Sequence, residues 1–357
     1  MKGKSFLLLA SLILFFLLFL LNSNSSASCQ KVKTEVILQD DYFWTENGFV
    51  PLPKNAIELE LKFSFQHLEM KHPFEMANDS SGNIYLTDEQ QNAVFKFNSS
   101  GEYLSQFGQE GKGFGKFSEP QNILLTKDFI VLQELKKKRI QFLDWAGKSL
   151  KTFKIDKDNI EDIALNEDGL LFIAKSLNIN DTALVNVLSS EGKLLYSFGD
   201  VFKFIPPYPS LNSRRLALNS KGEVLVAFTY LPLIRRYSQK GELLAEYEIE
   251  NSIMKAKEKM NLTLMGKARL NKFHYGYARI IIAMKVFEDK IYLLSNYPRL
   301  EILEVNEDGK IVNTFWRDSD ALYRPEDLLV EKIGKKKIFY VLQSAPEIAV
   351  DVFSLKQ

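Results

Sequence analysis

Residues 76–107 read MANDSSGNIYLTDEQQNAVFKFNSSGEYLSQF, and this stretch contains four short β-type runs separated by turns. The runs begin at Met76, Ile84, Ala93 and Tyr103, and Gly, Asn and Ser residues lie between them. Apolar and polar residues alternate along the runs, as they do in half-buried antiparallel strands joined by tight hairpins. The stretch therefore predicts one four-stranded antiparallel unit.

The same unit recurs along the chain. A turn glycine is followed six residues later by an aromatic residue in five pairs, which are Gly101/Phe107, Gly147/Phe153, Gly192/Phe198, Gly241/Tyr247 and Gly309/Phe315. Successive glycines are separated by 46, 45, 49 and 68 residues. A repeat of this length, built from short strands, is typical of a β-propeller with one four-stranded blade per repeat.

The last repeat, between residues 328 and 355, has only three predicted strands. Residues 57–65 (IELELKFSF) alternate strictly between apolar and polar side chains and have no partners of their own. Placed as the outer strand of the last blade, this segment closes the ring and removes an exposed edge. We therefore predict an all-β, six-bladed propeller of four-stranded antiparallel blades over residues 57–357, closed by the N-terminal strand at about residues 57–66.

The N-terminus carries a targeting pattern. Lys2 and Lys4 precede an apolar run at residues 6–21 and a short polar stretch, so residues 1–28 are predicted to be a signal peptide or an uncleaved signal anchor. Residues 29–56 are predicted to form an N-terminal arm. Ser26-Ala27-Ser28-Cys29 resembles a relaxed bacterial lipobox, so lipidation at Cys29 and plain secretion both stay open. Either way the protein is predicted to lie outside the cytoplasm, as a secreted, periplasmic or lipid-anchored protein that touches a membrane only through its N-terminus.

The composition is that of an ordinary globular protein. The chain has 357 residues, of which 46% are hydrophobic and 25% charged, and its net charge is +1. Such a balance supplies no overall field to hold a polyanion, so we expect no nucleic-acid partner. Cys29 is the only cysteine, so no intrachain disulfide can form. We expect a monomer.

Two segments carry a family resemblance. Residues 107–120 (FGQEGKGFGKFSEP) resemble the spaced-glycine linker between blades of NHL-repeat propellers, and residues 82–88 (GNIYLTD) resemble a strand of the same family. The match covers the first four-stranded unit, called blade one below, and the start of the second, blade two. It implies a six-bladed propeller whose members mostly bind ligands, peptides or RNA on one face, with a few relatives that are metal-dependent lyases or lactonases.

Aligning the repeats places one residue per blade at the start of each inner strand, where a propeller's channel opens. These residues are Glu75, Asn122, Asp162, Arg215, Ile281 and Asp327. We predict ligand contacts at the polar members of this set and at Arg214. The oxygens of Glu75, Asn122, Asp162 and Asp327 could hold Ca²⁺. The carboxylates could equally form an internal ion-pair cluster with Arg215.

Two insertions interrupt the repeats at residues 199–212 and 250–278. Both follow an outer strand, so both should lie on the rim near the channel mouth, and long structured loops are often functional. The first half of the second insertion is predicted to be an amphipathic helix. Tyr208, Phe273, Tyr275 and Tyr277 are the predicted rim contacts. A packing lid over blades four and five is the alternative.

Catalytic patterns are scarce in this sequence. The three histidines have no metal-ligand spacing, and there is no nucleophile elbow or phosphate-binding loop. The sequence therefore favours a propeller that binds a small-molecule or protein ligand at its channel mouth or rim. A calcium-dependent lactonase or hydrolase at the channel mouth and an envelope scaffold without a small ligand stay open as alternatives. Apart from calcium, we expect no cofactor.

Overall fold

The computed structural model describes residues 52–356, except for residues 112, 114, 156–158, 205–206, 272–275, 297 and 320–321 and the side chains of residues 267–271. The predicted signal segment, Cys29, most of the N-terminal arm, Phe273 and Tyr275 lie outside the described residues. Among the described helices, none combines the length and the apolar character needed to cross a bilayer.

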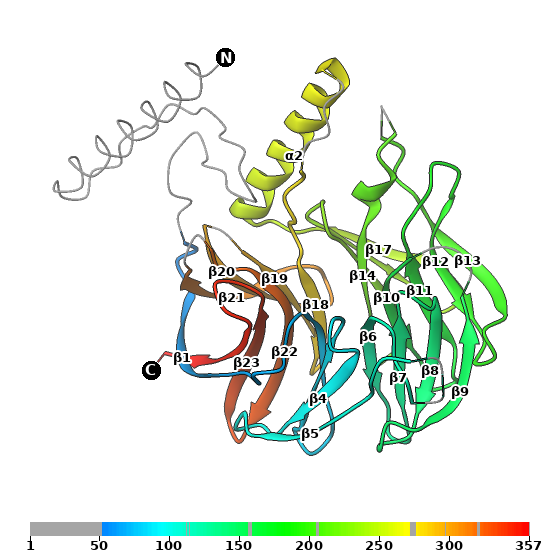
Figure 1. Ribbon diagram of the computed structural model, residues 1–357. Coiled ribbons are helices and arrows are strands. Elements are labelled where there is room, and N and C mark those ends of the chain that lie inside the picture. The colour runs from blue at the N-terminus through cyan, green and yellow to red at the C-terminus, as the bar shows by residue number, and fades with distance from the viewer. Residues whose placement is uncertain are drawn as a thin grey trace, which may run out of the picture. The chain divides into compact units, whose positions relative to one another are not determined.

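The first four blades are separate four-stranded antiparallel sheets, coloured from blue-cyan to yellow-green in Figure 1. Blade one consists of β2 (Pro73–Asn78), β3 (Ile84–Asp88), β4 (Ala93–Phe97) and β5 (Tyr103–Phe107). Blade two consists of β6 (Pro120–Leu125), β7 (Ile130–Glu134), β8 (Arg139–Leu143) and β9 (Ser149–Lys154). Blade three consists of β10 (Ile160–Leu165), β11 (Leu171–Lys175), β12 (Ala183–Leu188) and β13 (Leu194–Asp200). Blade four consists of β14 (Arg214–Leu218), β15 (Val224–Phe228), β16 (Leu233–Tyr237) and β17 (Leu243–Glu248).

Blades five and six are joined into one eight-stranded sheet. Blade five consists of β18 (Ala283–Phe287), β19 (Lys290–Ser295), β20 (Arg299–Val305) and β21 (Ile311–Asp318). Blade six consists of β22 (Pro325–Ile333), β23 (Lys336–Gln343), β24 (Ala349–Leu355) and β1 (Ile57–Phe65). The two blades join where β1 pairs in parallel with β21, at Ile57 opposite Phe315.

The N-terminal strand closes the ring. β1 runs antiparallel to β24, from Leu59 opposite Leu355 to Phe65 opposite Val350. Ser64 also donates a 2.5 Å hydrogen bond to Asp351 on β24. The six inner strands β2, β6, β10, β14, β18 and β22 contact one another in that order and back to β2. The predicted six-bladed propeller and its closure by the N-terminal strand are confirmed.

The turn glycines and the aromatic residues of the repeat meet between blades. A Cβ built on Gly101 would come within 2.7 Å of the Phe65 side chain, which lies at the end of β1. The later glycines stand in the same relation to the aromatic residue of the preceding blade: Gly147 to Phe107, Gly192 to Phe153, Gly241 to Phe198, and Gly309 to Tyr247. The repeat thus reflects a contact that locks each outer strand against the next blade.

Both rim insertions contain helical structure. The first includes a short 3-10 helix, Pro209–Asn212, and the buried Asn212 side chain bonds both the N–H and the carbonyl of Phe202. The second contains α2 (Ser252–Asn271), which is longer than the helix predicted for its first half. Asn261 on α2 exchanges two hydrogen bonds with the backbone of Ala278, so the helix is tied back to the chain that follows it.

Candidate functional site

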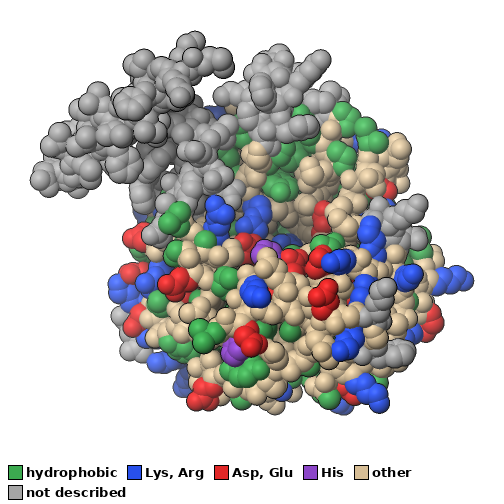
Figure 2. All heavy atoms as spheres, in the orientation of Figure 1, with side chains coloured by type: hydrophobic (Ala, Val, Ile, Leu, Met, Phe, Trp, Pro, Cys, Tyr) green, Lys and Arg blue, Asp and Glu red, His purple; other side chains and the backbone are tan. Residues whose placement is uncertain are grey.

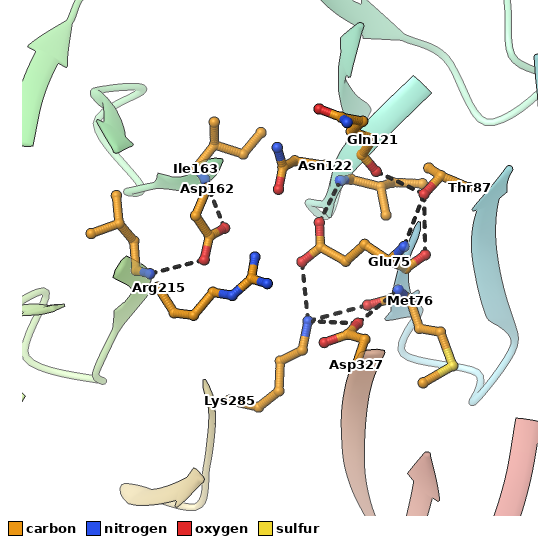
Figure 3. A network of polar contacts seen from close by, with 12 residues as sticks. Glu75, Met76, Thr87, Gln121, Asn122, Asp162, Ile163, Arg215, Lys285 and Asp327 are labelled. Carbon is orange, nitrogen blue, oxygen red and sulfur yellow. Dashed lines mark hydrogen bonds and ion pairs between the residues drawn. The ribbon is translucent and has the colours of Figure 1, made fainter. Parts of the chain in front are cut away.

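The inner strands of all six blades line one central cavity of about 450 Å³. Four of the predicted mouth residues, Glu75, Asp162, Arg215 and Asp327, are among its lining residues. Figure 3 shows these side chains converging from different blades. The repeat therefore brings together charged groups that are as much as 252 positions apart in the sequence (Glu75 to Asp327).

The three carboxylates tie neighbouring blades together. Each accepts a hydrogen bond from the backbone N–H of the next blade's inner strand: Glu75 from Ile123 at 3.0 Å, Asp162 from Leu216 at 2.9 Å, and Asp327 from Met76 at 2.8 Å. In each case the donor is the residue after the predicted mouth position of that blade. Buried N–H groups need such partners, so these carboxylates have a structural role in the ring.

Lys285 on β18 lies among these carboxylates. Its ammonium group is 3.1 Å from Glu75 Oε1 and 3.2 Å from Asp327 Oδ2, and it also donates to the carbonyl of Met76 at 3.3 Å. Burial lowers the pKa of Lys285, but the charges of Asp327, Glu75 and Asp162 outweigh burial and raise it above the usual range. Lys285 is therefore a charged part of the site at neutral pH.

Burial also changes the acidity of the carboxyl groups. It raises the pKa of Glu75 to about 7, since the opposing charge of Lys285 is offset by Asp327 and Asp162. Burial likewise raises the pKa of Asp162, against the charge of Arg215. Glu75 can consequently gain or lose a proton near neutral pH.

Sequence reasoning missed Lys285 because the spacing of the repeat placed Ile281 at the mouth of blade five. Ile281 is fully buried, in an apolar cluster with Leu225 and Met284. In blades one to four, the mouth residue comes three positions before the last residue of the inner strand that pairs with the second strand. These last paired residues are Asn78, Leu125, Leu165 and Leu218, in blade order. The last paired residue in β18 is Phe287, so the same count reaches Met284, next to Lys285.

Arg215 is directed from β14 toward the centre of the network (Figure 3). Its Nε donates to the carbonyl of Ile282 at 3.0 Å, and its Nη1 donates to the carbonyl of Glu161 at 3.4 Å. Among the described residues, no carboxylate lies within 4.0 Å of its guanidinium group. Arg215 is thus positioned by backbone carbonyls and not by an ion pair.

Arg214 and Asn122 lie beside the cavity and not in its lining. Arg214 is only 1% exposed, and its guanidinium bonds the carbonyls of Leu184, Lys175 and Asn212 between blades three and four. Asn122 is also buried; its Nδ2 donates to Gln133 at 2.8 Å, while its Oδ1 has no hydrogen-bond partner among the described residues.

The calcium candidates do not form a ligand set. Within the described part of the chain, no group of three or more His, Cys, Asp or Glu side chains is placed to hold a metal ion. The ammonium group of Lys285 instead contacts Glu75 and Asp327, and so occupies the position between these carboxylates that a metal ion would need. These residues as arranged do not fit Ca²⁺, which needs six to eight oxygen ligands. A bound calcium ion stays a prediction that solution measurements must test.

The described rim tyrosines pack against each other. The rings of Tyr208 and Tyr277 lie 5.8 Å apart in a T-shaped arrangement, and Tyr230 lies 6.4 Å from Tyr277. Tyr208 and Tyr277 therefore connect the two rim insertions. Neither lines the central cavity.

Comparison with known proteins assigns the family. Residues 61–251 match the family model DUF5128, described as a 6-bladed beta-propeller. The chain belongs to the DUF5128 family. This family of propellers has the blade number that the structure shows, and the match runs from β1 to just before α2. No curated protein matches the chain.

Solved structures resemble this DUF5128 protein in fold. A member of the duf4221 family from Bacteroides vulgatus is 11% identical with a TM-score of 0.58, and the match covers 85% of this chain and 98% of that one. A "Putative exported protein" from Bacteroides fragilis is 12% identical with a TM-score of 0.57, over 86% and 98% of the two chains. A streptogramin B lyase is 12% identical with a TM-score of 0.53, over 84% and 88%. At these identities the likeness concerns the fold alone.

Proposed function

We propose that this propeller binds a small polar ligand in its central cavity and works outside the cytoplasm. The observation that carries the proposal is the charged lining of the cavity, where Arg215 faces the channel without a carboxylate partner within 4.0 Å among the described residues. A cavity of about 450 Å³ is within the range of small-molecule sites, which bind a ligand through a few convergent polar groups.

The extracytoplasmic location is supported by the sequence of the N-terminus. A positively charged start, an apolar run and small polar residues follow one another, as in secretory signals. One structural neighbour bears the name of an exported protein. Lipidation at Cys29 and membership among NHL-type propellers belong to the same proposal, since both rest on short sequence patterns.

We further propose that the protein is a monomer with no nucleic-acid partner. The net charge is +1. On the face shown in Figure 2, acidic and basic side chains are interspersed and do not gather into a large patch of one sign. A nucleic-acid-binding surface needs such a basic patch. We therefore do not expect nucleic acid among the ligands of this protein.

The test is a thermal-shift screen of the full chain in mild detergent against a library of small polar molecules. Two variants, Ala77→Phe on β2 and Ala217→Phe on β14, enlarge side chains in the cavity lining on different blades. Ala146→Phe adds the same volume at an exposed turn and is the matched control. We expect molecules that raise the melting temperature of the wild type and of Ala146→Phe, but not of the cavity variants.

Binding outside the cavity would give shifts that survive both Ala77→Phe and Ala217→Phe. Such a result, or a screen without any shift, would overturn the proposal. It would favour the scaffold alternative, in which the rim insertions bind a protein partner. Far-UV circular dichroism of each variant shows whether it has folded, and a variant that has not folded is replaced by the other.

A further inference from the structure

We infer that the ligand of the central cavity carries a carboxylate group, which Arg215 binds through the free end of its guanidinium. This inference rests on the proposed function, because it names the chemical class of the ligand at that same site.

Arg215 has N–H donors left over. A guanidinium group has five of them. One on Nε is used by the carbonyl of Ile282, and one on Nη1 is used by the carbonyl of Glu161. No other described residue accepts a hydrogen bond from Arg215. One N–H on Nη1 and two on Nη2 therefore remain, and they lie at the end of the side chain that Figure 3 shows pointing to the centre of the ring.

The other cations near the channel are fully engaged. Lys285 contacts two carboxylates and a carbonyl. Arg214 has backbone carbonyls around its guanidinium and Glu161 at 3.5 Å. Arg215 differs from both, since no carboxylate of the described residues lies within 4.0 Å of its guanidinium group. Its charge acts on Asp162 from a greater distance, and the Asp162 oxygens accept hydrogen bonds from the backbone N–H groups of Ile163 and Leu216.

The remaining N–H groups match one acceptor well. Parallel N–H groups on the two terminal nitrogens of arginine bind both oxygens of a carboxylate in a planar, bidentate pair. The two bonds to carbonyls hold the guanidinium in place before the ligand arrives, which reduces the entropy lost on binding. A partly buried guanidinium gains more from such a pair than an exposed one does, because less water screens the interaction.

The carboxylates that line the cavity, Glu326 included, disfavour a ligand with more than one negative charge. Glu75, Asp162 and Asp327 lie around the same channel as Arg215 and Lys285. A phosphate or sulfate dianion would meet stronger repulsion from these carboxylates than a carboxylate monoanion would. The inferred ligand is consequently a small organic monocarboxylate.

The experiment compares acids with their neutral amides. The melting temperature of the full chain in detergent is measured with acetate, butyrate and benzoate, with acetamide, butyramide and benzamide, and with inorganic phosphate and sulfate. A ligand that binds only the folded state raises the melting temperature in a concentration-dependent way. We expect at least one of the three acids to raise it and its amide, phosphate and sulfate to have no effect at the same ionic strength.

Variants then test Arg215 itself. Arg215→Gln removes both the parallel N–H groups and the positive charge, and Arg215→Lys keeps the charge without the parallel N–H groups. Arg236→Gln removes the same charge on β16, outside the cavity lining, and is the matched control. We expect the dissociation constant of the active acid to rise at least tenfold in Arg215→Gln, to rise less in Arg215→Lys, and to stay unchanged in Arg236→Gln.

The results separate the inference from the proposed function. Equal shifts from an acid and its amide, a shift from phosphate or sulfate alone, or undiminished binding by Arg215→Gln would overturn the inference. The absence of a shift with all three acids would overturn it as well. Cavity binding by a neutral molecule that is lost in Ala217→Phe would still leave the proposed function in place.

Discussion

The aromatic ring of Phe107 lies directly against Gly147 of the following blade. A Cβ built on Gly147 would come within 2.3 Å of Phe107 Cδ2, and the backbone of Gly147 has a φ of +80°. The glycine is therefore required twice, by the close approach of the ring and by the left-handed backbone conformation. This contact explains why the sequence repeats a glycine and an aromatic residue at constant spacing.

Replacing this glycine should destabilise the propeller strongly. We expect Gly147→Ala to lower the free energy of unfolding by about 2–4 kcal/mol, because a methyl group overlaps the Phe107 ring and an alanine is strained at positive φ. Chemical denaturation measures the change. Gly266→Ala on α2 is the control: its Cβ would have no neighbour within 4 Å. That change should stabilise by up to about 1 kcal/mol, since alanine favours a helix.

The carboxylate of Asp162 should matter for the joining of blades three and four. In Asp162→Ala the backbone N–H groups of Leu216 and Ile163 lose their acceptor. We expect a loss of about 1–3 kcal/mol in the free energy of unfolding, the cost of leaving a buried donor without a partner. Asp128→Ala at an exposed turn should change it by less than about 0.5 kcal/mol. Equal effects of the two variants would contradict a role for Asp162 between blades.

Glu75 should make stability depend on pH. Its pKa is raised to about 7 in the folded protein, above the ordinary value of 4.5. The folded state thus holds this proton over a pH range where the unfolded state has already released it. The contribution of Glu75 to stability is present in full below about pH 4.5 and is lost as the pH rises through 7, by a few kcal/mol at most.

Glu75→Gln should remove this part of the pH dependence. We expect the melting temperature of the variant to change less than that of the wild type between pH 4.5 and 7. Glu102→Gln, on the surface of blade one, is a suitable control, because burial does not act on an exposed carboxyl. A variant profile parallel to the wild-type profile would show that Glu75 titrates near its ordinary value.

Lys285 should decide whether calcium can bind. Its ammonium group contacts Glu75 and Asp327, so we expect Ca²⁺ to leave the melting temperature of the wild type unchanged. A concentration of about 5 mM, roughly a thousandfold excess over protein, is enough to saturate a weak site. Lys285→Gln leaves two buried carboxylates without a counter-charge and should destabilise by about 3–5 kcal/mol. Ca²⁺ should restore part of that loss, and EDTA should remove the effect.

The matched control for this experiment is Lys332→Gln. Lys332 forms an exposed ion pair with Glu288 at 3.0 Å, and exposed pairs contribute about 0–1 kcal/mol. The melting temperature of the Lys332→Gln variant should not respond to calcium. A calcium-dependent shift in the wild type, lost in Asp162→Ala, would instead confirm the calcium site predicted from the sequence.

The ring architecture could be predicted from the sequence because its signals are local. The hairpin turns, the alternating strands and the constant spacing from glycine to aromatic residue all lie within one repeat. The segment 57–65 had no predicted partner, and the last blade was the only one that lacked a predicted fourth strand. The alternation of this segment predicted its partner strand but not the full register: Leu59 and Phe65 are buried against β24, while the pairing shifts by one residue between Leu61 and Phe63, which are exposed.

The candidate site was predictable only in part. Glu75, Asp162, Arg215 and Asp327 could be found because each follows the repeat, and all four line the cavity. Lys285 was missed, because the preceding insertion and a shorter hairpin turn changed the register of blade five. A lysine between apolar residues of a strand, as in Ala283–Phe287, is the signal that would have shown it.

The sequence by itself determined the number of blades, the strand that closes the ring and the positions of most charged residues at the channel. These properties depend on side-chain periodicity and turn chemistry, which act over a few residues. Only the tertiary structure decided which charges are paired. Whether Lys285 contacts Glu75 and Asp327, and whether Arg215 is left with free donors, depends on distances between strands of different blades, and no local pattern in the chain specifies those distances.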